Sequence, residues 1–544
     1  MSIGFDLNGR RGGLSADWRT FVASAAERAF GTGATAYKRK GTAVSKLWVV
    51  CNESVSSLSE ARGLLSSAEV LQSWLGEETI VCVATIDYPG SMHRTEEMLG
   101  GGVSSFASLL DFAKTVSPGD YVVFLGPCAE LECQFFAKLV ERALCEAAGL
   151  VLFDLWYEED GIAYPVLMGG IDAVAIDYCD YIFSTFIVRG DVLTEAVGDA
   201  PPSLSPWGLS KRVISRSLAL DSFNALYMQL PLVRDDGIRL KFLHEKERLI
   251  GLDFAMQRRY QDLAVRDRSE TRARIAAIIC TKDKCHLLSQ LVRGLAMNWD
   301  VTEIVIVSNN PVNRYSKETL NNLSAIDKVS IVEYAGDFNF SEQCNLGVSK
   351  TASPRLLFLN DDIVPINPNW LESLNDVLDR FPFVGAVGSL LLYPNETVQH
   401  GGMYLGFNNC AGHEFRGATL PDDGYLYRCL VPRSASCVTG AVMLVERAVF
   451  DALNGFDRKL ATYLQDVDLC QRINGLGKKV VFTPLSKLFH MESVSLSNEK
   501  CSSKLLEKRG LEHQVFFRRW GGRKDDYRSG LFDIQSEGNY RMIV

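Results

Sequence analysis

The sequence predicts an α/β protein of two tandem Rossmann-like domains, each with a mostly parallel sheet, joined by a helical connector. The chain has 544 residues, more than a single hydrophobic core usually accommodates. In both halves, runs of β-branched and aromatic residues alternate with periodic helical stretches, which is typical of parallel strands covered by helices. The halves also resemble each other, since GDYVVFLGPCAELECQFFAKLVERAL matches SPRLLFLNDDIVPINPNWLESLNDVL as a strand, a polar turn and a helix.

The first domain is predicted over residues 1–240 and the connector over 241–273. Strands are expected where apolar, β-branched and aromatic residues dominate, at 46–52, 79–86, 121–126 and 150–156. The periodic run CQFFAKLVERALCEAA predicts a helix. The connector sequence is dense in charge and favours a helix.

The second domain is predicted over residues 274–544. Its strands are expected at 274–280, 303–308, 328–334, 355–360 and 383–392. Helical patterns follow the first, second and fourth of them, which predicts a doubly wound sheet. A helical tail is expected at the C-terminal end.

The composition argues for an ordinary globular protein that does not bind nucleic acid. Lys and Arg total 57 against 66 acidic residues, a net charge of −9, whereas nucleic-acid binding depends on cations that contact phosphates. The 14 cysteines include no CxxC pair, so they are interpreted as reduced and structural. The first residues lack the apolar stretch of a signal peptide, and no window has the apolar length of a membrane span.

Two clusters of carboxylate residues are the candidates for ligand binding and catalysis. Asn360, Asp361 and Asp362 end an apolar strand and so deliver oxygen ligands to the carboxyl end of a sheet, where open α/β folds bind ligands and where a hard cation could meet a diphosphate. The run LQDVDL puts Asp466 and Asp468 at the start of an amphipathic helix. From the residues alone, a turn is the better interpretation of the first cluster, and the second could be a helix cap.

The stretch from Arg274 to about Phe532 resembles the family 2 glycosyltransferases of bacterial surface-polysaccharide synthesis. The likeness is to the rhamnosyltransferase-like kind, which have the GT-A fold. The matching runs, in order, are IICTKDKCHLLSQL, FNFSEQCNLGVSKT, LLFLNDDIVPINPNWLESL, VGAVGSLLLYPNETVQHGG, AGHEFRG, VTGAVMLVERAVFDALNGFD, LQDVDLCQRI, LFHMES and VFFRRWGGRKDDY.

The first half is similar to the degenerate GT-A-like domain that precedes the catalytic one in tandem members of the group. It has Gly126, Pro127, Cys128 and Ala129 where the family places acidic metal ligands. Because Cys and Ala offer no hard oxygen ligand, this half is expected to be non-catalytic.

The resemblance implies a role for each site residue. Asp466 matches the catalytic base, and Asp362 and His490 match ligands of a divalent cation, Mg²⁺ or Mn²⁺. The residues that match nucleotide-sugar contacts are Thr281, Asp283, Ser308, Asn345, Asn360, Asp361 and Gly440. On the residues alone, Thr281 and Asp283 fit a polar turn, Asn345 a helix cap, Gly440 a bulge and His490 a core position equally well. His400 and His413 are expected either to line the sugar or acceptor pocket or to stabilise their loops.

The function implied is that of an inverting, metal-dependent glycosyltransferase. It would move a sugar from a nucleoside-diphosphate sugar to a cell-surface polysaccharide or a lipid-linked glycan acceptor. The alternative is a non-catalytic glycan-binding or scaffold protein of a polysaccharide assembly complex, because Ser308, Asn360 and Gln465 depart from the family pattern. The protein is expected in the cytoplasm or at the inner face of the plasma membrane. Peripheral membrane association through the basic and aromatic run 516–524, and homo-oligomer formation, are left open.

Overall fold

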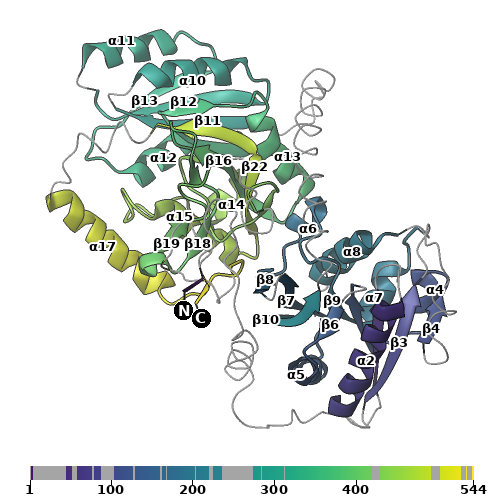
Figure 1. The fold of residues 1–544 in the computed structure, drawn as a ribbon. Helices are drawn as coiled ribbons and strands as arrows, with labels where there is room; N and C mark the ends of the chain where they lie inside the picture. Colours follow the sequence, from purple (N-terminus) through teal and green to yellow (C-terminus); the bar gives the residue numbers. More distant parts are fainter. Residues whose placement is uncertain are drawn as a thin grey trace.

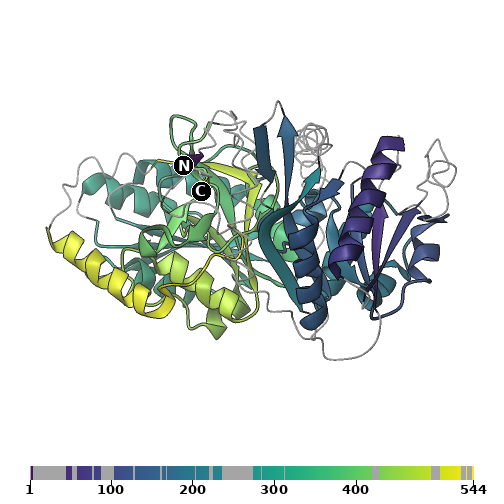
Figure 2. The ribbon, with the colours of Figure 1, turned by 60° about the horizontal axis from the view of Figure 1, so that its bottom comes forward.

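The computed structural model places two α/β domains side by side (Figures 1 and 2). The described residues are 2–3, 45–51, 58–75, 79–86, 103–126, 129–159, 162–166, 168–201, 204–219, 224–235, 274–282, 285–311, 313–419, 428–491, 503–528, 535 and 542–543. The predicted connector 241–273 lies outside them. The predicted domain boundaries stay predictions.

The first domain is built on a nine-stranded sheet of order β4-β3-β2-β5-β9-β7-β10-β6, with β8 paired to β7. Its strands are β2 (Ser45–Cys51), β3 (Thr79–Ile86), β4 (Val103–Phe106), β5 (Tyr121–Leu125), β6 (Ala129–Leu131), β7 (Leu150–Glu159), β8 (Ile162–Val166), β9 (Phe186–Arg189) and β10 (Ala225–Asp235). Its helices are α2 (Leu58–Leu75), α4 (Leu109–Ala113), α5 (Cys133–Cys145), α6 (Ala175–Tyr178), α7 (Gly190–Val197) and α8 (Pro206–Ala219).

The second domain is built on a ten-stranded sheet of order β13-β12-β11-β14-β21-β16-β22-β15, with β17 paired to β16 and β20 to β22. Its strands are β11 (Ile275–Thr281), β12 (Val301–Ser308), β13 (Val329–Glu333), β14 (Arg355–Asn360), β15 (Ile363–Pro365), β16 (Val384–Leu392), β17 (Val398–His400), β20 (Arg433–Ser434), β21 (Val442–Glu446) and β22 (Lys479–His490). Its helices are α10 (Cys285–Met297), α11 (Arg314–Leu323), α12 (Phe340–Val348), α13 (Trp370–Arg380), α14 (Arg447–Ala452), α15 (Gln465–Gly475) and α17 (Ser503–Trp520).

Three smaller elements complete the chain. A separate hairpin of β18 (Met403–Leu405) and β19 (Ala411–His413) surrounds the short 3-10 helix η1 (Phe407–Asn409). The strands β1 (Ser2–Ile3) and β23 (Met542–Ile543) pair with each other and bring the two ends of the chain together (Figure 1).

The two sheets share one strand order and one set of strand directions. In each, three neighbouring strand pairs are parallel, and then one antiparallel strand, β9 or β21, separates the two parts of the sheet. The predicted α/β class is confirmed, and the sheets are mixed because of these antiparallel strands. The last strand pair of each sheet is also equivalent. In the first domain Ala129 lies beside Asp235, and at the same place in the second domain Ile363 lies beside His490.

The core of the second domain explains why its central strands are so apolar. Every residue of β16 is buried, as are all of β14 except its last, because both faces of the sheet are covered. Gly388 on β16 permits an especially close approach, since a Cβ atom there would lie 2.5 Å from Val438 Cβ. That contact fixes the segment leading into Gly440.

The domains meet through a buried carboxylate and an ion pair. Asp172 accepts hydrogen bonds from the backbone nitrogen of Ser434 at 2.8 Å and from its hydroxyl at 2.9 Å. Asp177, on α6, pairs with Arg380 at the end of α13, whose guanidinium also lies 5.0 Å from the Tyr178 ring centre. These contacts hold the first domain against α13 and β20. Across the described ranges, no helix is both long enough and apolar enough to span a membrane.

Candidate active site

Strand pairing brings Asp362 and His490 together. The turn after β14 carries Asp361 and Asp362 and leads into β15, which pairs with the end of β22 so that Ile363 faces His490. The backbone nitrogen of Met491 also donates to the Asp362 carbonyl at 3.1 Å. As a result, Asp362 Oδ1 lies 3.3 Å from His490 Nε2.

The hydrogen bonds of His490 prepare its Nε2 atom to act as a ligand. Nδ1 lies 2.8 Å from Gln399 Oε1, which is only an acceptor, so Nδ1 carries the proton. Nε2 then presents its lone pair, and Asn360 Nδ2 lies 3.1 Å away as a donor. A neutral imidazole held in this tautomer by a neighbouring oxygen is the usual form of a metal-binding histidine.

Asp362 and His490 present two donor atoms that could hold a divalent cation. Mg²⁺ is commonly held by one or two protein side chains, with waters and substrate phosphates completing its shell. Within the described ranges, no group of three or more His, Cys, Asp or Glu residues is arranged to hold a metal. The donor set fits a cation that is bound together with a phosphate-bearing substrate.

Asp466 lies at the start of α15, held by backbone amides. Gly440 N donates to its Oδ2 and Val467 N to its Oδ1, each at 2.8 Å. Burial raises the pKa of Asp466 above the ordinary carboxyl value of 3.8, although these hydrogen bonds oppose the shift. The carboxylate is therefore fixed in position and is a stronger base than an exposed one.

The backbone before Asp466 is strained. Leu464 has φ 64°, in the left-handed region that a bulky residue rarely adopts. Such a conformation costs about 1–3 kcal/mol and persists only where the surrounding structure enforces it. Leu464 is nearly buried and lines the same cavity as Asp466.

One cavity of about 560 Å³ reaches from Asp466 to His490, and Asp362 is not among its lining residues. Asn360, Gly440, Asp466 and His490 line it, and Asn360 N donates to the Ala441 carbonyl at 3.0 Å, which joins the two groups. The remaining walls are largely aromatic and basic, and come from α12, the β18–β19 hairpin, the segment before α15, and α17. These wall residues include Phe338, Phe340, Phe407, His413, Arg416, Tyr463 and Arg509.

The structure brings only some of the residues expected to bind the nucleotide close to one another. The Thr281 hydroxyl donates to Asp361 Oδ2 at 2.7 Å, and Ser308 pairs with Thr281 across β12 and β11, so these residues share one sheet edge with Asn360. Asp283 lies outside the described residues. Asn345 is not among the cavity residues: its Nδ2 donates to the Phe456 carbonyl at 2.8 Å and its Oδ1 accepts from Phe456 N at 3.0 Å.

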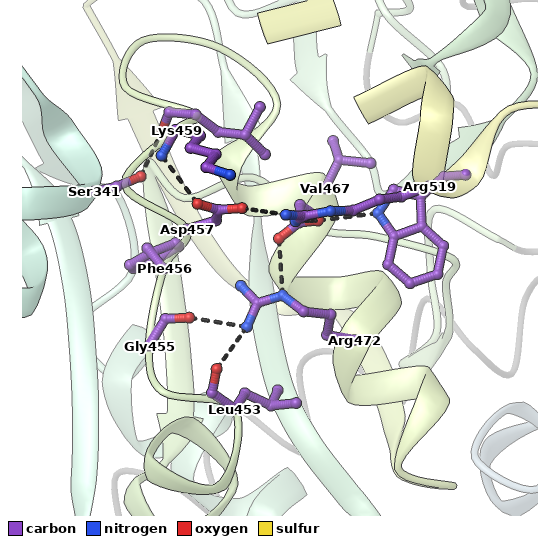
Figure 3. Close-up of polar contacts among 12 residues, drawn as sticks. Ser341, Leu453, Gly455, Phe456, Asp457, Lys459, Val467, Arg472 and Arg519 are labelled. Carbon is purple, nitrogen blue, oxygen red and sulfur yellow. Dashed lines mark hydrogen bonds and ion pairs between the residues drawn. The ribbon is translucent and has the colours of Figure 1, made fainter. Parts of the chain in front are cut away.

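Neither Asn345 nor Asp468 caps a helix. The cap of α12 is Asn339, whose side chain accepts from Glu342 N. Asp468 is fully buried and accepts from Arg472 Nε at 2.8 Å and from Arg519 Nη1 and Trp520 Nε1, each at 3.0 Å. Asp468 therefore ties α15 to α17, through the arginines Arg472 and Arg519 that are labelled in Figure 3.

His400 and His413 form a buried pair with Nδ1 atoms 2.9 Å apart. Burial lowers the pKa of His413 to about 4 and that of His400 well below 6.5, so both are neutral near pH 7. His413 lines the cavity, whereas His400 lies behind it. The expected pocket position therefore holds for His413.

Gln399, Leu464 and Arg509 were not identified from the sequence. Leu464 precedes the QDVD run and could have been found from that proximity. Gln399 and Arg509 carry no sequence signal for the site, because strand pairing and helix docking alone bring them there.

Residues 276–452 match the model of the glycosyl transferase family 2. This segment belongs to the family 2 glycosyltransferases. The glycosyltransferase segment supplies β11, β14 and Gly440, whereas Asp466 and His490 lie beyond its matched end.

Among similar curated proteins, the O-antigen biosynthesis protein RfbC of Myxococcus xanthus is 34% identical over 227 residues, 41% of this chain and 18% of the relative. The protein y4gI of Sinorhizobium fredii is 30% identical over 250 residues, 45% and 27% of the two chains. An N-acetylglucosaminyl-diphospho-decaprenol L-rhamnosyltransferase of Mycobacterium tuberculosis is 27% identical over 158 residues, 27% of this chain and 52% of that one. The chain thus spans at most about half the length of these relatives.

Two solved structures are more distantly similar. GalNAc-T7 with UDP, GalNAc and Mn²⁺ is 15% identical with a TM-score of 0.34, over 41% of this chain and 44% of that chain. The mannosyltransferase PcManGT of Pyrobaculum calidifontis, in complex with GDP-Man and Mn²⁺, is 13% identical with a TM-score of 0.34, over 52% and 76%.

Proposed function

We propose that this protein is an inverting, metal-dependent glycosyltransferase. It would transfer a sugar from a nucleoside-diphosphate donor to a hydroxyl of a surface polysaccharide or a lipid-linked glycan, on the cytoplasmic side of the membrane. The observation that carries the proposal is that Asp466, with its raised pKa, shares one cavity with Asn360 and His490 in a chain of this family. The acceptor class is supported by the names of the two relatives in polysaccharide synthesis.

Asp466 acts as the general base. It removes the proton from the acceptor hydroxyl as the acceptor oxygen attacks the anomeric carbon, and a single displacement inverts that carbon. The amide nitrogens of Gly440 and Val467 each occupy one lone pair of the carboxylate and so fix its orientation. Each oxygen keeps a further lone pair for the incoming proton.

Asp362 and His490 would hold the divalent cation, and Asn360 lies beside them. When bound, the cation would neutralise charge on the departing diphosphate. Thr281, Ser308 and Asp361 form the neighbouring sheet edge, where the nucleoside of the donor would lie. The first domain would not catalyse transfer, because Gly126 stands at the strand position of Asn360 and carries no side-chain oxygen.

The substitution Asp466→Asn tests the proposal. Nucleoside diphosphate release is measured with a panel of UDP-, dTDP- and GDP-sugars, and inversion is read from the anomeric configuration of the product. We expect Asp466→Asn to lower transfer by about 10²–10⁴-fold, the usual contribution of a general base. Binding of the donor nucleotide with Mn²⁺ should be retained.

The control is Asp451→Asn, since the Asp451 side chain is 57% exposed and only 3.8 Å from Arg447. Undiminished transfer by Asp466→Asn would refute the assignment. Metal-dependent nucleotide binding with no turnover of any donor would instead favour the scaffold alternative. In the wild type, the rate of transfer should fall at low pH with a midpoint above the ordinary carboxyl pKa. The reason is that Asp466, whose pKa is raised, must be ionised to act.

A further inference from the structure

The helix α17 lies on the side of the second domain away from the first domain (Figures 1 and 2), and its Arg509 lines the cavity. Its inward face carries Glu512, which is 3% exposed and accepts hydrogen bonds from Ala461 N at 3.1 Å and Thr462 N at 3.2 Å. Near its end, Arg519 and Trp520 bind Asp468. The helix is therefore fixed against the segment that leads to the base.

Arg509 lies one turn before Glu512 on this inward face and reaches the cavity. Its guanidinium lies 6.0 Å from the centre of the Tyr463 ring. Its Nε atom is buried and, among the described residues, has no hydrogen-bond partner. Nor does any described carboxylate pair with Arg509, whereas Arg519 on the same helix pairs with both Asp457 and Asp468.

Arg509 is half-buried, and its Nε atom has lost contact with water without gaining a hydrogen-bond acceptor among the described residues. Burying a donor without a partner is unfavourable, and the aromatic ring of Tyr463 offsets only part of the loss. The planar fork of donors in arginine is suited to phosphate and carboxylate groups. An anionic ligand in the cavity would supply the missing partner.

The position of Arg509 indicates which ligand carries the anion. Contacts lead from His490 through Asn360, Ala441 and Gly440 to Asp466. Tyr463, three residues before Asp466, then leads on to Arg509. In this series of contacts Arg509 is connected to the base through Tyr463, whereas Asp466, Gly440 and Asn360 come between it and His490. The exposed rings of Phe338 and Tyr463 line the same cavity and offer apolar faces to a sugar.

We propose that Arg509 binds an anionic group of the acceptor, either a phosphate of a diphosphate linkage or the carboxylate of an acidic sugar. The assignment to the acceptor rests on the proposed function, because it takes Asp466 as the base and the His490 end as the donor end. Arg509 is then a specificity-determining residue that excludes neutral acceptors.

Calorimetry with simple anions tests the proposal. Inorganic pyrophosphate and methyl β-D-glucuronide are titrated separately, without divalent cation, into the wild-type protein, Arg509→Gln, Arg509→Lys and Arg518→Gln. Arg518 is the matched control because it is an exposed arginine of the same helix. We expect Arg509→Gln to weaken one of the two anions at least about tenfold, since hydrogen bonds to charged groups contribute at that level. The anion whose binding is weakened shows whether Arg509 binds a phosphate or a carboxylate of the acceptor.

Arg509→Lys should bind that anion with intermediate affinity, because the charge is kept and the fork is lost. Arg518→Gln should match the wild type. A third titration uses UDP with Mn²⁺, whose binding should not change in Arg509→Gln. The proposal is overturned if the wild type binds neither anion, if Arg509→Gln binds both as the wild type does, or if it loses UDP with Mn²⁺ instead. None of these measurements needs turnover, so their failure is distinct from failure of the Asp466→Asn test.

Discussion

The buried carboxylate of Asp468 attaches the C-terminal end of α17 to the rest of the second domain, as Glu512 attaches its middle. It is 0% exposed and accepts three hydrogen bonds, from Arg472, Arg519 and Trp520. Asp468→Ala leaves the indole nitrogen of Trp520 without this acceptor. Arg472 keeps its bonds to the Leu453 and Gly455 carbonyls, and Arg519 keeps Asp457 (Figure 3).

Removing one partner from a buried ion pair usually costs about 3–5 kcal/mol. Because both arginines keep other partners, we expect the lower end, about 3 kcal/mol. For a domain of this size, that corresponds to a fall in Tm of about 6–12 °C. Asp468→Asn should cost less than Asp468→Ala, since its amide oxygen can still accept from Trp520.

The assay is thermal unfolding followed by tryptophan fluorescence, with Trp520 as a local probe. The control is Glu318→Ala, because Glu318 pairs with Arg314 at 2.7 Å and both side chains are more than half exposed. A surface pair of this kind contributes about 0.2–1 kcal/mol. If Asp468→Ala lowers Tm no more than Glu318→Ala does, the buried carboxylate does not hold α17 against the rest of the domain.

Two further outcomes are expected. Burial raises the pKa of Asp154 on β7 to about 7, above its value of about 4 in the unfolded chain. The folded protein therefore binds the extra proton between these values, so stability should fall by up to about 1.4 kcal/mol per unit as pH rises from 4 to 7. Urea unfolding across this range should show a weaker pH dependence for Asp154→Asn, and an unchanged one would contradict the assignment. Separately, Gln399→Leu should weaken Mn²⁺-dependent binding of nucleoside diphosphate about 10–100-fold by releasing the His490 ring. Unaltered affinity would count against His490 as a ligand.

The strands and the polar turn after β14 were predictable because their signals are local. The run LLFL is apolar throughout, since both of its faces are covered, and the change to Asn360, Asp361 and Asp362 marks the end of the strand. The likeness between the two halves covered one strand, its turn and the following helix, and the structure extends it to the strand order of the two sheets. By contrast, β21 was missed, and its antiparallel direction makes the sheets mixed, because strand direction depends on the path of the chain and not on residue periodicity.

The amino-acid sequence alone determined the α/β class, the family of the segment 276–452 and the carboxylates available for chemistry. Only the tertiary structure decided how they are used. The register of β15 on β22 sets Asp362 beside His490, and the docking of α17 brings Arg509 to the cavity. The tertiary structure also engages Asn345 and Asp468 in structural hydrogen bonds. Local patterns record whether a residue is covered, whereas contacts between distant segments depend on which strands and helices pack together, and a single sequence does not encode that in any short window.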